Sequence, residues 1–120
     1  MNKKQLFTQL NSLCREMSCS YDINCGGCCF VAAIIAEQLE VFNIPFKVAI
    51  TRNPTHYAIK VSDRYINRDD FNFKFFEFYD YNSSYLYDCY YKEYWNPTYN
   101  KKWNLIVRTR IKSLFNKYGN

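Results

Sequence analysis

Cys28 is the residue whose type and position best suit covalent chemistry. It follows Gly26 and Gly27 and opens an apolar run that extends to Ala36. Such a run predicts a buried helix, and the first turn of a helix lowers the pKa of a thiol through its macrodipole and unpaired N–H groups. The same N–H groups can hold an oxyanion, and glycines let a substrate backbone approach closely. The pattern therefore predicts a nucleophilic thiolate at Cys28.

The base for this thiol is expected to be His56, the single histidine of the chain. His56 opens a predicted strand, and a Ser-Asp turn further on predicts a hairpin whose second strand ends at Asn67. Because the turn lies near the midpoint, we expect positions 56 and 67 to face each other. Cys28, His56 and Asn67 would then act as nucleophile, base and orienter. Asp69 or Asp70 could take the place of Asn67.

The elements that must position these residues follow from hydrophobic periodicity and turn residues. Helices are predicted over Asn2–Met17, Cys28–Phe42 and Asn100–Tyr118, and strands over Phe46–Thr51, His56–Val61 and Arg64–Asn67. Asn43 and Pro45 predict the end of the middle helix. Residues 18–27 are expected to form a linker. Residues 71–95 hold 13 aromatic residues and are expected to form a strand and an irregular, packed loop.

Length and composition limit the chain to one domain over residues 1–120. Its expected class is α+β, with a buried catalytic helix on a small antiparallel sheet and flanking N- and C-terminal helices. The longest apolar run has nine residues, too short for a membrane span, and no apolar segment follows Lys3 and Lys4 as in a secretory signal. A cytoplasmic protein is expected. The chain is rich in aromatic residues, Asn, Lys and Ile, which have AT-rich codons, and this composition suits a small bacterial or bacteriophage genome.

Several short motifs within residues 24–67 resemble papain-like and transglutaminase-like cysteine hydrolases. The Cys-Gly-Gly-Cys string at Cys25–Cys28 resembles the signature around the papain nucleophile. The Asn-Ile-Pro step at Asn43–Pro45, followed by a strand, resembles the end of the catalytic helix in transglutaminase-like proteins. The strings His56–Val61 and Arg64–Asn67 resemble the histidine strand and the acid strand of that superfamily.

This resemblance implies a compact papain-like or transglutaminase-like core, with Cys28 as nucleophile, His56 as base and Asn67 as orienter. Papain has an aromatic residue after its nucleophile, whereas position 29 here is cysteine. The chain is also similar to bacteriocin-processing peptidases, and that likeness would make Cys25 the nucleophile instead.

The function that these residues favour is that of a small cysteine hydrolase or acyltransferase. Attack of the Cys28 thiolate on an amide or ester carbonyl, assisted by His56, would form a thioester intermediate. Water would complete hydrolysis, whereas an amine acceptor would make the enzyme a transferase. The expected substrate is a peptide or protein, and the chemistry requires no metal or organic cofactor.

A non-catalytic binding protein on the same fold is the main alternative. The chain carries a net charge of +5, and residues 96–120 hold six basic residues and no acidic one. A basic closing helix could contact an acidic partner, such as a host component of a bacteriophage protein. The aromatic residues of 71–95 are interspersed with few basic ones, which favours packing over nucleic-acid binding.

A zinc-stabilised domain is a further alternative, since Cys25 and Cys28 have the spacing of zinc ligands. Cys19 or Cys89 could complete such a site. However, the sequence has no second Cys-x-x-Cys pair, and Cys14 falls on the apolar stripe of the first helix.

Overall fold

Four helices and a four-stranded sheet form the computed structural model, which describes residues 2–21, 27–52, 55–68, 76–95 and 100–119. In chain order the elements are α1 (Lys3–Tyr21), α2 (Cys28–Val41), β1 (Lys47–Thr51), β2 (His56–Val61), β3 (Arg64–Ile66), β4 (Glu77–Tyr79), α3 (Ser83–Glu93) and α4 (Asn100–Tyr118). This arrangement confirms the α+β class predicted from the sequence.

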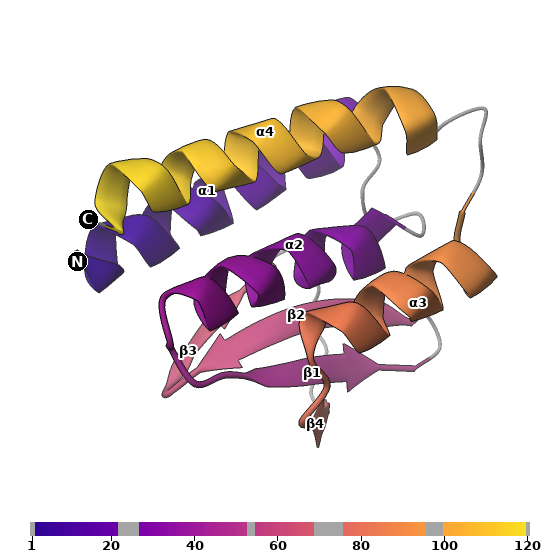
Figure 1. Cartoon of the computed structure of the whole chain (residues 1–120), viewed down its shortest axis with the longest axis horizontal. Helices are drawn as coiled ribbons and strands as arrows, with labels where there is room; N and C mark the ends of the chain where they lie inside the picture. Colours follow the sequence, from indigo (N-terminus) through magenta and orange to yellow (C-terminus); the bar gives the residue numbers. More distant parts are fainter. Residues whose placement is uncertain (1, 22–26, 53–54, 69–75, 96–99, 120) are drawn as a thin grey trace.

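The sheet has the strand order β3-β2-β1-β4, and its three pairings are antiparallel over the described residues. Val48 of β1 lies opposite Ile59 of β2 in the central pair. Side chains alternate between the two faces of a strand, so these two residues share a face, and that face packs against α2. Figure 1 shows α2 and α3 on this side of the sheet, with α1 and α4 as a further layer beyond α2.

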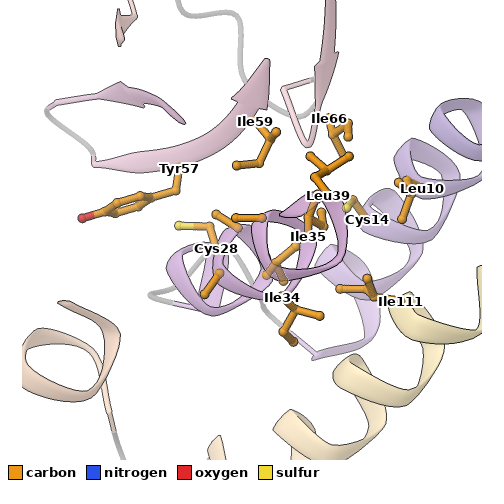
Figure 2. Packing of buried hydrophobic residues seen from close by; sticks show 14 of the residues in the cluster. Leu10, Cys14, Cys28, Ile34, Ile35, Leu39, Tyr57, Ile59, Ile66 and Ile111 are labelled. Atoms are coloured by element: carbon orange, nitrogen blue, oxygen red, sulfur yellow. The ribbon is translucent and has the colours of Figure 1, made fainter. Parts of the chain in front are cut away.

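The helix α2 is enclosed by neighbours because its sequence is apolar on every side. Eleven of its 14 residues are buried, and residues 33–36 are fully so. Its side chains contact the sheet on one side and α1 and α4 on the other (Figure 2). The helix ends as predicted: Asn43 adopts a left-handed conformation with φ 55°, and the Ile44 N–H donates to the Leu39 carbonyl over 2.9 Å.

The helices α1 and α4 pack together along their apolar stripes, as the periodicity predicted. The buried residues of the α1 stripe are Leu6, Leu10, Leu13, Cys14 and Met17, and those of α4 are Val107, Ile111 and Phe115. Arg110 of α4 donates two hydrogen bonds of 2.9 Å to the carboxylate of Glu16 on α1. Within the described ranges, no helix combines the length and the apolarity needed to cross a membrane.

Two predictions about irregular segments were wrong. Residues 71–95 contain the helix α3, where only a strand and a packed loop were expected, and α1 continues to Tyr21 into the predicted linker. The many tyrosines of this segment favour strands by propensity, but Leu86 and Tyr90 are four residues apart and bury one helical face. Asn82 begins α3 as its N-cap, with an extended backbone.

Replacing Asn82 by alanine is expected to lower the free energy of unfolding by about 1 kcal/mol. The reason is that the Asn82 Oδ1 accepts a hydrogen bond of 2.8 Å from the Tyr85 N–H, which otherwise has no helical partner. Urea unfolding measures the change. Asn82→Asp keeps the acceptor and should remain close to wild type, so equal losses in both variants would contradict the cap.

Candidate functional site

Cys28 is the first residue of α2 and follows Gly27, whose backbone is already helical. Gly27 has no side chain to cap this helix, and the N–H groups of a first helical turn are the kind of donor that can hold an oxyanion. The Cys28 side chain is 2% exposed. Its sulfur lies on the side of α2 that faces β2 (Figure 2).

His56 is the first residue of β2 and is fully buried. Figure 1 shows that α2 and β2 run in the same direction, so Cys28 and His56 lie at the same end of these two layers. Alternation along β2 directs Tyr57 and Ile59 toward α2, whereas His56 shares the opposite face with Ala58. A contact between the imidazole and the thiol would have to pass around the end of the sheet, and it stays a prediction.

The structure brings His56 and Asn67 together, but through the main chain. The His56 Nε2 lies 2.5 Å from the Asn67 carbonyl oxygen. A carbonyl can only accept, so the Nε2 must carry the proton and donate it. In the neutral ring the Nδ1 is then the basic nitrogen. The expected orienting contact through the side chain of Asn67 is not the one observed.

The predicted register of the hairpin was also wrong. Ile59 pairs with Ile66, so continuing the ladder would place Asn67 opposite Ala58, two residues along β2 from His56. Asn67 reaches the imidazole because its backbone turns into the left-handed region, with φ 68°, a conformation that asparagine tolerates. Its own side chain is buried, and the Nδ2 has no hydrogen-bond partner among the described residues.

Asn11 of α1 is a residue of this site that the sequence did not single out. Its Oδ1 accepts a 2.8 Å hydrogen bond from the Asn67 N–H, and its Nδ2 donates over 2.9 Å to the Tyr65 carbonyl. Asn11 thus pairs with the outer edge of β3 as a neighbouring strand would. One sequence signal was present: Asn11 is polar but lies four residues after buried Phe7 and three before buried Cys14, on the apolar stripe.

The neighbouring Cys29 differs sharply from a reactive thiol. Both Cys28 and Cys29 are buried, but the Cys29 Sγ donates a 3.5 Å hydrogen bond to the Leu86 carbonyl of α3. Burial raises the pKa of the Cys29 thiol, and the nearby Cys28 and Cys89 raise it further. Cys29 is therefore protonated at neutral pH and serves as a packing residue.

Tyr57 is the β2 side chain that approaches the start of α2. Its ring meets that of Tyr94 edge-on, with centroids 6.0 Å apart. Burial raises the pKa of Tyr57, and a hydrogen bond with Tyr94 raises it further. Burial also raises the pKa of Tyr94. Both phenols therefore remain neutral and keep their hydroxyl protons.

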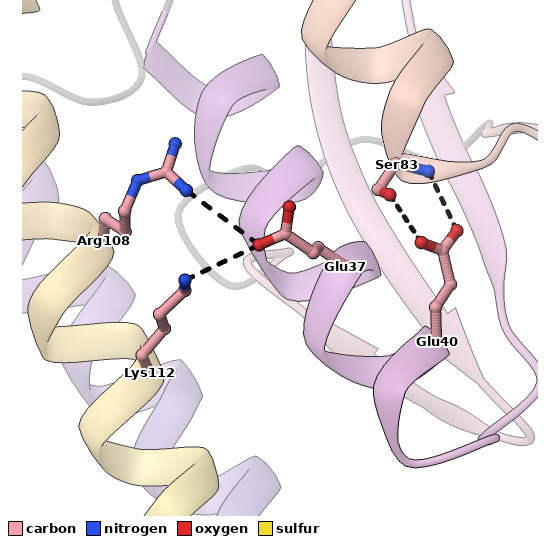
Figure 3. Close-up of polar contacts among 5 residues, drawn as sticks. All are labelled: Glu37, Glu40, Ser83, Arg108 and Lys112. Carbon is pink, nitrogen blue, oxygen red and sulfur yellow. Dashed lines mark hydrogen bonds and ion pairs between the residues drawn. The ribbon is translucent and has the colours of Figure 1, made fainter.

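Three of the basic residues of α4 contact other helices. Arg108 and Lys112 lie 3.9 and 3.8 Å from the Glu37 carboxylate of α2 (Figure 3). Arg110 pairs with Glu16 of α1. The guanidinium of Arg108 also lies 5.5 Å from the centre of the Phe30 ring. These contacts hold α4 against α1 and α2. Three of the basic residues near the C-terminal end of the sequence thus have a structural role.

The alternative site residues fall largely outside the structural description. Cys25, Asp69 and Asp70 lie in undescribed segments, as does the side chain of Cys19. Among the residues that are described, no three His, Cys, Asp or Glu side chains are grouped to hold a metal ion. The choice between Cys28 and Cys25 as nucleophile therefore stays a prediction.

Comparison of the chain with family models, with curated proteins and with solved structures gives no match. Only the chain's own residues and their geometry therefore indicate a function. The strongest structural observation is the buried contact between His56 and Asn67. Cys28 begins its helix at the same end of the fold.

Proposed function

We propose that this protein is a small thiol hydrolase or acyltransferase with a papain-like or transglutaminase-like core. One observation carries the proposal: the only histidine is buried, and its Nε2 proton is held by the Asn67 carbonyl. This hydrogen bond selects the tautomer whose Nδ1 can accept a proton. A fully buried imidazole in a fixed tautomer suits a general base better than a surface residue.

The proposed reaction begins when the Cys28 Sγ attacks an amide or ester carbonyl carbon while its proton passes to the His56 Nδ1. In this scheme the N–H groups at the start of α2 stabilise the oxyanion. The carbon–nitrogen or carbon–oxygen bond then breaks, and the leaving group takes the proton from Nδ1. A thioester remains on Cys28. Water or an amine resolves it and restores the thiol, with His56 again transferring the proton.

The substrate class is a peptide or protein that presents an amide or ester carbonyl at the start of α2. The roles divide between two elements: α2 supplies the nucleophile and the oxyanion donors, and β2 supplies the base. Asn67 acts through its carbonyl in this scheme, so its side chain is not required for the proton transfer.

The test is the rate of alkylation of each cysteine by iodoacetamide across pH, resolved by mass spectrometry, in wild type and His56→Ala. In wild type we expect Cys28 to react below pH 7, roughly tenfold or more faster than the half-buried Cys89. His56→Ala should remove this advantage. Cys29 is the internal control and should remain unreactive while the protein is folded, which circular dichroism verifies in both proteins.

Two outcomes would overturn the assignment. Fast, His56-dependent alkylation of Cys25 would keep the thiol enzyme but move the nucleophile. If all thiols react only above about pH 8, as ordinary cysteines do, the enzyme proposal falls and the binding alternative replaces it.

A further inference from the structure

Two hydrogen bonds join α1 to the buried imidazole through Asn67, and a third holds Asn11 to Tyr65. The Asn11 carboxamide donates to the Tyr65 carbonyl over 2.9 Å and accepts from the Asn67 N–H over 2.8 Å. The Asn67 carbonyl then accepts from the His56 Nε2 over 2.5 Å. The last two bonds use the N–H and the C=O of the same residue, so they fix the orientation of that residue from both sides.

Asn11 matches this position because one planar carboxamide presents a donor and an acceptor together. Tyr65 lies in β3 and Asn67 directly follows this strand, and the C=O of Tyr65 and the N–H of Asn67 both point toward Asn11. An alanine at position 11 would satisfy neither group. An aspartate would keep the acceptor for Asn67 and lose only the donor to Tyr65.

Apart from the packing of its buried side chain, the polar contacts of Asn67 among the described residues are the ones to Asn11 and His56. The strand ladder ends at Ile66, and the backbone of Asn67 has the left-handed φ of 68°. Its side-chain Nδ2 has no hydrogen-bond partner among the described residues. The direction of the Asn67 carbonyl therefore depends on the N–H contact with Asn11.

We propose that Asn11 is a positioning residue for His56: by holding the main chain of Asn67, it fixes the imidazole in the Nε2–H tautomer. The role of Asn11 in catalysis rests on the proposed thiol chemistry, whereas its control of the tautomer does not. Asn11 touches neither the reacting thiol nor the imidazole in the described contacts and acts through Asn67.

The tautomer can be read directly by ¹⁵N NMR, because His56 is the only histidine and gives the only imidazole signals. At a pH where the ring is neutral, wild type should show the Nε2–H form. In Asn11→Ala we expect a mixture of tautomers and at least a tenfold faster solvent exchange of the ring N–H. Asn11→Asp, which keeps the acceptor, should retain the wild-type tautomer and remains informative if the alanine variant does not fold.

Two control variants distinguish positioning of the His56 imidazole from a general loss of stability and from a role of the Asn67 side chain. Asn82→Ala weakens the protein at a distant helix cap and should leave the imidazole signals unchanged. Asn67→Gly keeps the carbonyl and allows the left-handed φ, so it should also keep the tautomer. An unchanged tautomer in folded Asn11→Ala would overturn the proposal. Loss of the tautomer in Asn67→Gly would also overturn it, because the side chain of Asn67 would then be the orienting group.

Alkylation of Cys28 in Asn11→Ala distinguishes this inference from the proposed function. A tautomer change together with slower Cys28 alkylation, approaching the rate in His56→Ala, supports both. A tautomer change without any effect on Cys28 keeps Asn11 as the positioning residue and removes the thiol chemistry. No tautomer change removes the role of Asn11 whatever the thiol does.

Discussion

Raising the pH above about 9 is expected to destabilise the protein steeply and to unfold it cooperatively. Three acids lie in the core with pKa values raised mainly by burial: Cys29, Tyr57 and Tyr90. Their ordinary pKa values are 9.0 for the thiol and 10.0 for the phenols. In the unfolded chain each loses its proton near that value, whereas in the folded protein each keeps it.

Proton linkage sets the direction in which the free energy of unfolding changes with pH. Above their ordinary pKa values the folded state binds more protons than the unfolded state, so stability falls as pH rises. Below about pH 9 these groups are protonated in both the folded and the unfolded state, so they do not lower the stability. Above pH 10, each such group removes about 1.4 kcal/mol for each pH unit over which it keeps its proton in the folded protein. Total stabilities of about 5–15 kcal/mol would be exhausted within a few pH units.

Circular dichroism and tyrosinate absorbance, followed together against pH, measure this effect. Exposed tyrosines should ionise first, and the buried ones only as helicity is lost. Cys29→Ala and Tyr57→Phe each remove one titrating group and should make the loss of stability less steep. Ionisation of the buried phenols near pH 10 with helicity intact would contradict the expectation.

Replacing Phe30 by alanine is expected to lower the free energy of unfolding by about 3–5 kcal/mol. Phe30 is 2% exposed and lies between two other helices. Its ring centre is 4.9 Å from that of Tyr90 on α3, and the Arg108 guanidinium of α4 covers it at 5.5 Å. Truncation would leave a cavity where α2, α3 and α4 meet. Urea unfolding of the variant gives the loss directly.

Val41→Ala is the matched control, because Val41 lies on the same helix and is 67% exposed. Its effect should remain within about 0.5 kcal/mol. A loss below about 1 kcal/mol in Phe30→Ala would show that α3 and α4 close the cavity by moving together. The aromatic packing around Phe30 would then be far more adaptable than its buried contacts indicate.

The parts of the fold that could be predicted are those in which apolar residues recur with a clear pattern along the sequence. The all-apolar stretch that starts at Cys28 had to be buried, and the stripe from Leu6 to Met17 had to face a core. The helix α3 was missed because its tyrosines carry strand propensity, and only the Asn82 cap and the Leu86–Tyr90 spacing indicate a helix. Local preference was overridden there by packing against α2.

The candidate site shows a different limit. Residue type and spacing identified His56 and Asn67, and the structure brings them together. The contact uses a backbone carbonyl, which every residue has, so no choice of side chain at position 67 could reveal it. Asn11 likewise recognises backbone groups, 54 and 56 residues further along the chain. Sequence patterns report side chains, and this site depends on main-chain groups held by a distant asparagine.

The pairing of α1 with α4 has a consequence for synthesis on the ribosome. Glu16 and Arg110 are separated by 94 residues, so the contact between the first helix and the last can form only after α4 has been made. Until then the outer side of α2, where Ile34 faces Ile111, has no cover (Figure 2). The nascent chain must carry its most apolar helix partly exposed through most of translation, which makes chaperone binding during synthesis an expected feature of its biogenesis.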